Sequence, residues 1–248
     1  NVTALALLVP GEHVLDVACG TGTAARVAAQ YVTATGTVAG LDIDPGMIEV
    51  ARSRPSSSEG ARLSWHCGSA LDMPFSGGMF DAVLCLQGLQ FFPDKLAGLR
   101  EMRRVLKPAG RLAASVWRTI EHCKGHHALT EALERHGVDA SAARRPFSLG
   151  DAEELNRLAH EAGFREVNVQ AVVKVIRFHS PRQFIESLAA GAPSTRHALA
   201  KLPGSERGVL VDEMAASLQR YVDREGVAIP YASHLLLARP QPERYAGR

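Results

Sequence analysis

The stretch HVLDVACGTGTAARVAAQ, residues 13–30, decides the fold. Its first half is an apolar run typical of a buried strand, and its alanine-rich second half predicts a helix from about Thr21 to Tyr31. Gly20 and Gly22 lie where the strand passes into the helix. Because glycine lacks a Cβ, the backbone N–H groups of such a loop can approach a ligand closely. The stretch therefore predicts the nucleotide-binding unit of an α/β protein.

Strand and helix patterns continue to alternate as far as residue 117, which is typical of a parallel sheet with crossover helices. Asp44 and Pro45 are a favoured N-cap and a favoured first helical residue, so we expect a helix to begin there. Another helix is expected to end at residues 108–110, because proline and glycine stop helices. The further strands that we expect are TVAGLD at 37–42, RLSWHC at 62–67, FDAVLCL at 80–86 and RLAASVW at 111–117.

The pattern changes after residue 117. The next thirty residues are rich in His and Arg without a strand pattern, and we take them as an insertion at the carboxyl ends of the strands. Helical patterns return at 151–163 and again over residues 179–228. The helices of residues 179–228 are expected to cover the ligand pocket as a cap, although an extension of the hydrophobic core would give the same apolar spacing. We predict a single domain, 1–248, made of a cofactor-binding core (1–117 and 148–178), an insertion (118–147), a helical cap (179–228) and a closing strand (229–240).

The composition is that of an ordinary globular protein, with 46% hydrophobic and 22% charged residues. Lys and Arg number 28 against 26 Asp and Glu, which argues against a nucleic acid or a membrane surface as the partner. The four cysteines form no CxxC pair, and this pattern fits a protein of a reducing compartment. ALALLV at 4–9 is too short to span a bilayer and lacks signal-peptide flanks. We expect a cytoplasmic protein and, because the chain begins at Asn1 and not at Met, a preceding segment.

Two aspartates narrow the choice of ligand. Asp42 stands at the end of the second expected strand, where a carboxylate can accept hydrogen bonds from both hydroxyls of a ribose. This feature suits a nicotinamide dinucleotide and S-adenosylmethionine equally well. Asp16 favours the second ligand, because a carboxylate beside the loop would repel a pyrophosphate but attract the ammonium group of a methionine moiety. A loop-capping carboxylate is the alternative interpretation of Asp16.

Five segments in order resemble motifs of the class I S-adenosylmethionine-dependent methyltransferases: LDVACGTG, LDIDPGMI, GSALDMPF, FDAVLCLQGLQFFPD and LREMRRVLKPAGRL. Within this class the sequence is similar to the small-molecule branch that includes the ubiquinone and menaquinone biosynthesis methyltransferases. The resemblance implies a three-layer, doubly wound, Rossmann-like sheet of seven strands with an antiparallel last strand. It also implies methyl transfer to a small-molecule acceptor by in-line displacement.

The resemblance further implies how S-adenosyl-L-methionine is bound. Residues 16–22 would hold its methionine end, Asp42 its ribose, and Ile43 and Met47 its adenine. The family usually carries an aspartate directly after the glycine of this motif, and that aspartate accepts a hydrogen bond from the adenine amino group. This chain reads Gly68-Ser69-Ala70 instead, so the contact to adenine would have to come from Ser69, the Ala70 N–H or Asp72. The cofactor-binding residues that we expect are Asp16, Ala18, Gly20, Thr21, Gly22, Asp42, Ile43, Met47, Ser69, Ala70, Leu86 and Gln87.

Methyl transfer from a sulfonium requires no acid–base residue, but a protonated acceptor would benefit from a histidine base. EHCKGHH, residues 121–127, places His122 and His126 in the insertion, and these are our candidate catalytic residues. The alternative is a partly solvated loop with incidental histidines, because Gly125 is expected to interrupt any helix that would align them. We expect no metal ion, since no carboxylate stands at a familiar ligand spacing.

Other residues near the insertion are candidates for acceptor binding. Trp117 and Phe147 could form an apolar wall, and Arg118, Arg144 and Arg145 could recognise an acidic substituent. Core packing of the aromatic residues and a solvated basic face are the alternative interpretations.

The choice of acceptor depends on the segment after the fourth strand. Family members that methylate nucleic acid bases often carry an Asn/Asp-Pro-Pro-aromatic motif there, whereas this chain reads Leu86-Gln87-Gly88-Leu89. A small-molecule acceptor is therefore the expected partner. Two alternatives stay open, namely a non-catalytic S-adenosylmethionine-binding protein and a nicotinamide-dependent oxidoreductase. The sequence indicates neither the acceptor atom nor the oligomeric state.

Overall fold

The computed structural model describes residues 6–55, 60–191 and 193–240. Residues 1–5 and 241–248, which the predicted single domain includes, lie outside these described residues.

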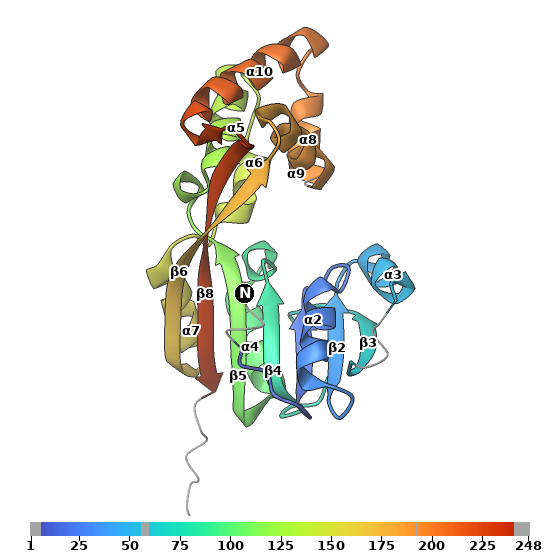
Figure 1. Ribbon diagram of the computed structural model, residues 1–248. Coiled ribbons are helices and arrows are strands. Elements are labelled where there is room, and N and C mark those ends of the chain that lie inside the picture. The colour runs from blue at the N-terminus through green and yellow to red at the C-terminus, as the bar shows by residue number, and fades with distance from the viewer. Residues whose placement is uncertain (1–5, 56–59, 192, 241–248) are drawn as a thin grey trace, which may run out of the picture. The chain divides into compact units, whose positions relative to one another are not determined.

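The chain forms two compact units, whose elements are labelled in Figure 1. The first unit consists of residues 1–116, 151–170 and 234–248, and the second consists of residues 117–150 and 171–233. The single-domain organisation stays a prediction.

A mixed sheet organises the described chain. Its strands are β1 (His13–Val17), β2 (Thr37–Asp42), β3 (Arg62–Cys67), β4 (Phe80–Leu86), β5 (Leu106–Trp117), β6 (Phe164–Phe178), β7 (Val222–Asp223) and β8 (Gly226–Pro240). Their order is β3-β2-β1-β4-β5-β8-β6, and the short β7 pairs with β8 outside this path. The first five strands pair in parallel, whereas the arrow of β8 in Figure 1 points the opposite way. The predicted sheet with an antiparallel last strand is therefore confirmed, with β7 as a short addition.

The parallel pairing sets the position of the candidate site. Asp16 near the end of β1 lies in register with Gly40 of β2 and Leu84 of β4. The carboxyl ends of these three strands consequently lie side by side at one edge of the sheet, where open α/β sheets bind their ligands.

Small side chains bring α2 (Thr23–Val32) close to the sheet of the first unit. Ala25, Ala28 and Val32 are fully buried in one cluster with Val14 and Val38, so that the helix buries a continuous apolar face. Figure 1 shows α2 on one face of the sheet, and α4 (Lys95–Val105) and α7 (Ala152–Glu161) on the other.

The predicted capping residues are confirmed. Asp44 precedes α3 (Pro45–Ser53), and its Oδ1 accepts a hydrogen bond from the Gly46 N–H at 2.8 Å while Pro45 takes the first helical position. Gly163 follows Ala162, the C-cap residue of α7, and has the positive φ of 89° that favours glycine at this position.

The end of α4 differs from the prediction. The helix stops at Val105, before the expected stop at 108–110, and the chain enters β5 directly with Leu106 in register with Phe80 of β4. Lys107 donates to the Asp81 carboxylate at 2.8 Å and does not extend the helix. Pairing with β4 therefore prevails over helix propensity in this segment, and the strand begins five residues before the expected residue 111.

The second unit is mainly helical. Three helices of this unit, α8, α9 and α10, lie within the predicted cap. The apolar spacing of this segment predicts one buried stripe of Leu210, Met214, Leu218 and Tyr221; the first three are buried, whereas Tyr221 is only partly buried. The predicted cap ends too late, because β7 and β8 begin before residue 228. The helical elements are η2 (Ile120–His122), α5 (Lys124–Arg135), α6 (Ser141–Arg144), η3 (Arg145–Phe147), α8 (Pro181–Gly191), α9 (Pro193–Ala200), α10 (Gly204–Ser217) and η4 (Gln219–Tyr221); the 3-10 helix η1 (Leu89–Phe91) belongs to the first unit.

Gly125 does not interrupt a helix, contrary to our expectation. It lies in the first turn of α5, buried where an added Cβ would overlap the Phe184 ring and lie 2.8 Å from the Tyr231 Oη. Close packing therefore explains the glycine, and it outweighs the modest cost of glycine in a helix.

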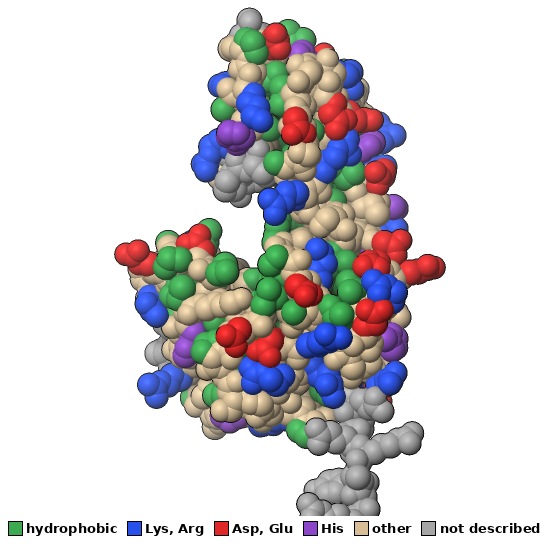
Figure 2. Space-filling view, turned by 180° about the vertical axis from the view of Figure 1, so that it is seen from behind, with side chains coloured by type: hydrophobic (Ala, Val, Ile, Leu, Met, Phe, Trp, Pro, Cys, Tyr) green, Lys and Arg blue, Asp and Glu red, His purple; other side chains and the backbone are tan. Residues whose placement is uncertain are grey.

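Lys and Arg side chains are interspersed with Asp and Glu on the face shown in Figure 2, without one basic patch. Across the part of the chain that the structure describes, no helix has both the length and the apolar character that crossing a membrane requires.

The packing around Gly125 predicts opposite effects for alanine at two helical glycines. We expect Gly125→Ala to lower the free energy of unfolding by about 1–3 kcal/mol through overpacking. Gly208→Ala, in α10 where nothing lies within 4 Å of the added Cβ, is expected to raise it by up to about 1 kcal/mol. Urea unfolding measures both, and shifts of the same sign would contradict this account of Gly125.

Candidate functional site

A tight loop joins β1 to α2 and forms one wall of the candidate site. Ala18, Gly20 and Gly22 have positive φ values of 54°, 53° and 79°. The Cys19 N–H donates to the Leu41 carbonyl of β2 at 3.0 Å and so holds the loop against the neighbouring strand. Left-handed backbone costs glycine little but costs Ala18 about 1 kcal/mol, a strain typical of binding sites.

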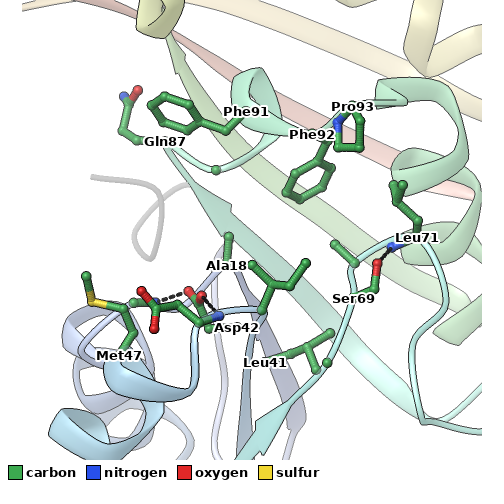
Figure 3. Close-up of a pocket in the computed structure, with 16 residues that line it drawn as sticks. Ala18, Leu41, Asp42, Met47, Ser69, Leu71, Gln87, Phe91, Phe92 and Pro93 are labelled. Carbon is green, nitrogen blue, oxygen red and sulfur yellow. Dashed lines mark hydrogen bonds between the residues drawn. The ribbon is translucent and has the colours of Figure 1, made fainter. Parts of the chain in front are cut away.

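A pocket of about 590 Å³ opens beside this loop, at the carboxyl ends of β1, β2 and β4 (Figure 3). An added Cβ at Gly20 would have no atom within 4 Å, so the backbone at this point is open to a ligand. The expected cofactor-binding residues that line the pocket are Ala18, Gly20, Asp42, Ile43, Met47, Ser69, Ala70 and Gln87.

Asp42 links the glycine loop to the segment before α3 on one side of the pocket. Its Oδ2 accepts a hydrogen bond from the Gly20 N–H at 2.7 Å, and its Oδ1 accepts one from the Asp44 N–H at 3.0 Å (Figure 3). Each carboxylate oxygen has a second lone pair. Asp42 therefore orients the glycine loop and can still accept hydrogen bonds from a ligand in the pocket.

Apolar side chains stand on both sides of this pocket. In Figure 3, Phe91 and Phe92 lie across the pocket from Asp42 and Met47. Phe91 is 51% exposed and Ile43 is 72% exposed, values that are high for such side chains and typical of a ligand-binding surface. Our sequence reasoning missed both phenylalanines, although two adjacent aromatic residues in the loop after β4 were a usable signal.

Ser69 stands where the family usually carries an aspartate, and its hydroxyl already has a local role. Its Oγ accepts a hydrogen bond from the Leu71 N–H at 3.1 Å, which closes a tight turn in the pocket wall. The hydroxyl hydrogen can still be donated to a ligand. Asp72 is exposed and is not among the pocket-lining residues. The structure therefore does not support Asp72 as the residue that contacts the adenine in place of the family aspartate.

Asp16 faces a second hollow of about 380 Å³, which shares Ala18 and Gly20 with the first. The expected residue Leu86 also lines it. Asp16 is 1% exposed, and its carboxylate oxygens accept no hydrogen bond of ordinary geometry from any residue that the structure describes. Burial raises the pKa of Asp16 to about 7; the Ala25 backbone N–H opposes this shift, and the Asp42 carboxylate adds to it. A buried acceptor without a partner suits a cationic group of a ligand.

Thr21 and Gly22 were expected to bind the cofactor, but neither lines the two hollows. Their backbone carbonyls instead accept hydrogen bonds from the Arg26 guanidinium at 3.1 and 3.0 Å. The same guanidinium donates to three carbonyls at the end of α3, at 2.6–3.2 Å, and lies over the Trp65 ring at 5.1 Å. Arg26, which our sequence reasoning missed, therefore joins the glycine loop to α3.

Both candidate catalytic histidines lie in the second unit, and their base role stays a prediction. His122 is exposed, and each of its ring nitrogens has a hydrogen-bond partner. Its Nε2 lies 3.0 Å from the Arg118 Nη2, and its Nδ1 lies 3.0 Å from the Thr119 Oγ1. The Nδ1 of His126 lies 3.0 Å from the Tyr231 Oη. Burial lowers the pKa of both imidazoles, that of His126 to about 4, and the Arg118 and Lys124 charges add to the shift at His122.

The other acceptor-binding candidates are also in the second unit. Phe147 is buried and its ring centroid lies 6.5 Å from that of Trp117. Arg144 pairs with Glu134 at 3.0 Å, and Arg145 is exposed. Within the described ranges, no group of three His, Cys, Asp or Glu side chains is placed to hold a metal ion.

Comparison with known proteins agrees with this geometry. A family model described as a methyltransferase domain matches residues 14–110. The demethylmenaquinone methyltransferase of Staphylococcus aureus is 32% identical over 177 residues, which are 65% of this chain and 71% of the relative. The O-methyltransferase resE of Aspergillus sclerotiorum is 32% identical over 157 residues, 62% of this chain and 55% of the relative. The YcgJ protein of Bacillus subtilis shares the fold, with a TM-score of 0.63 at 18% identity over 96% of each chain.

The mostly parallel sheet with its late antiparallel strand is that of the Rossmann-like methyltransferases. The chain belongs to the class I S-adenosylmethionine-dependent methyltransferase family, whose cofactor is S-adenosylmethionine. It spans just over half the length of its fungal relative.

The contacts of Arg26 predict that lysine cannot replace it. A lysine ammonium has three donors and no planar fork, so Arg26→Lys leaves carbonyl groups unpaired at the loop. We expect the free energy of unfolding to fall by about 1–3 kcal/mol and affinity for S-adenosylhomocysteine to fall with it. Arg54→Lys is the matched control, because Arg54 is exposed and donates to the Thr21 hydroxyl and not to the loop carbonyls. Equal losses in the two variants would contradict the role of Arg26.

The raised pKa of Asp16 predicts a pH-dependent penalty in the ligand-free protein. The folded-state pKa, about 7, lies above the ordinary 3.8, so the favourable contribution of Asp16 is present below pH 3.8 and is lost as the pH rises through 7. Compared with Asp16→Asn, the wild type is expected to lose up to about 4 kcal/mol of stability over this range. Urea unfolding at acidic and alkaline pH measures the difference in the free energy of unfolding between the wild type and Asp16→Asn. This difference would not change with pH if Asp16 were ionised throughout.

Proposed function

We propose that this protein transfers the methyl group of S-adenosylmethionine to a small-molecule acceptor. The observation that carries the proposal is the position of Asp42, which lines an open pocket while its Oδ2 holds the bare backbone of Gly20. A carboxylate beside a glycine loop, at the carboxyl end of the second strand, is suited to a ribose with free hydroxyls.

The residues of the two hollows fit the parts of this cofactor. Asp42 would accept hydrogen bonds from the ribose hydroxyls, and the exposed side chains of Ile43 and Met47 would cover the adenine. The buried Asp16 carboxylate would receive the ammonium group of the methionine moiety through the second hollow. Binding of a cation there would lower the raised pKa of Asp16, so cofactor binding at pH 7 would release a proton.

The cofactor supplies an electrophilic methyl group on an activated sulfonium leaving group. The chain's own contribution is to bind, to orient the acceptor and to exclude water. Apolar side chains such as Phe91 and Phe92, which line the pocket, support the exclusion of water.

A small acceptor is favoured over a macromolecule. The Staphylococcus aureus relative is named for a quinone-type small molecule, demethylmenaquinone. The formal net charge is only +2. On the face shown in Figure 2, basic and acidic side chains are interspersed and do not form the basic stripe that is typical of nucleic acid binding.

Calorimetry with S-adenosylhomocysteine tests the assignment of Asp42. We expect Asp42→Ala to weaken binding by about 1–3 kcal/mol, the size of a lost charge-assisted hydrogen bond. Asp44→Ala is the matched control, because Asp44 lines the same pocket but caps α3, so we expect a smaller effect on affinity. Binding of NADPH in place of S-adenosylhomocysteine would indicate an oxidoreductase. Binding without transfer of radiolabelled methyl groups to any small molecule of a cell extract would indicate a non-catalytic protein.

A further inference from the structure

The loop after β3 forms one wall of the candidate pocket and begins beside Asp42. Asp42 and Cys67 are paired residues of the parallel strands β2 and β3, and the Gly68 N–H donates to the Asp42 carbonyl at 2.9 Å. Ser69 of this loop lines the pocket on the side opposite to Met47 (Figure 3). A nucleoside whose ribose is bound by Asp42 can therefore reach this wall with its base.

Ser69 carries the polar side chain of this wall. The other residues of the loop that line the pocket, Gly68, Ala70 and Leu71, bring only backbone groups and hydrocarbon to it. Asp72 follows directly but is exposed and does not line the pocket. Among the residues that the structure describes, this wall consequently presents no carboxylate to a base.

The remaining polar side chains that line the pocket belong to other segments. Asp42 and Asp44 stand at the end of β2, where the Asp44 Oδ1 accepts the Gly46 N–H at 2.8 Å and caps α3. Gln87 belongs to the loop after β4. The polar edge of a base at the β3 wall would therefore meet the Ser69 hydroxyl and the backbone of its loop.

The Ser69 hydroxyl can act as a donor or as an acceptor. Its Oγ accepts the Leu71 N–H at 3.1 Å, which occupies one lone pair. A second lone pair and the hydroxyl hydrogen remain for a ligand, and this hydrogen can rotate about the Cβ–Oγ bond. The backbone N–H groups of Ser69 and Ala70 donate to no acceptor within the described ranges, so they add two further donors to the wall.

We infer that Ser69 lets this pocket bind a purine with an oxygen at C6 about as well as a purine with an amino group there. The inference rests on the proposed function and concerns the base of the same ligand. Toward an amino group the Oγ accepts, and toward a carbonyl oxygen the hydroxyl donates. A carboxylate at position 69 could only accept, so it would require the amino group.

The change at C6 also changes N1, and the wall can pair both forms of the ring. In a 6-oxopurine N1 carries a hydrogen, whereas in adenine it is an acceptor. The spare lone pair of the Ser69 Oγ can accept the N1 hydrogen while a backbone N–H of the loop donates to the C6 oxygen. With adenine, the Ala70 N–H can donate to N1 and the Oγ can accept from the amino group. The added ligand class is therefore the 6-oxopurine nucleoside thioethers, such as S-inosylhomocysteine.

Calorimetry with two ligands tests this tolerance without any need for turnover. S-adenosylhomocysteine and S-inosylhomocysteine differ only in the group at C6 and in the hydrogen on N1. We expect the two dissociation constants of the wild type to agree within about threefold, because neither ligand leaves a polar group of the wall or of the base unpaired. A preference of the wild type for S-adenosylhomocysteine by tenfold or more would overturn the inference.

Two variants at position 69 test whether the hydroxyl is responsible. We expect Ser69→Asp to bind S-adenosylhomocysteine at least about tenfold more tightly than S-inosylhomocysteine, because a carboxylate accepts from the amino group but repels the C6 oxygen. Ser69→Thr keeps the hydroxyl and is expected to keep the ratio of the wild type. An unchanged ratio in a folded Ser69→Asp protein, checked by circular dichroism, would overturn the role of Ser69. The ratio in the wild type decides the inference even if this variant does not fold.

Asp42→Ala is the matched control within the same pocket. The ribose that Asp42 would bind is identical in the two ligands, so we expect both affinities to fall by the same factor and their ratio to stay unchanged. Failure of the wild type to bind either ligand would count against the proposed function and against the inference that rests on it. Binding of S-adenosylhomocysteine alone would support the proposed function and overturn only the tolerance assigned to Ser69.

Discussion

The hydrogen bond from the Gly20 N–H to the Asp42 carboxylate is the contact on which the rest of the candidate site depends. It joins the loop after β1 to the end of β2, two segments that the parallel register already brings side by side. Gly20 takes a left-handed conformation, and no side chain covers the opened backbone. One carboxylate thus shapes the loop and faces the pocket, so the geometry of the loop and the ability to bind a ribose are not independent properties.

Much of the first unit could be predicted from the sequence because its signals are local. The strand TVAGLD, the cap at Asp44 and the apolar run of β4 each depend on residues close in the chain, and the structure places them as expected. Gly20, Asp42 and Met47 could also be predicted, because each belongs to a short sequence motif, and all three line one pocket. The antiparallel β8 was predicted only through resemblance, since no local pattern specifies the direction of a strand.

The features that sequence reasoning missed depend on contacts between distant segments. Position 125 in α5 holds a glycine because the Phe184 ring and the Tyr231 hydroxyl leave no room for a Cβ, a fact that its neighbours in sequence do not reveal. Arg26 looks like a surface residue of an amphipathic helix, yet its guanidinium serves carbonyls on two other segments. The histidines were recognised as chemically interesting, but the direction of their ring protons depends on Arg118 and Tyr231.

The place of β8 in the sheet has a consequence for how the chain matures. β8 is synthesised after the other strands that the structure describes, yet it lies between β5 and β6 and supplies a hydrogen-bonding edge to each. Until the ribosome has released residues 226–240, those two strands are open edges on a nascent protein. Such edges template unwanted pairing with other chains, so β5 and β6 are exposed to aggregation until β8 has been made and has paired with them.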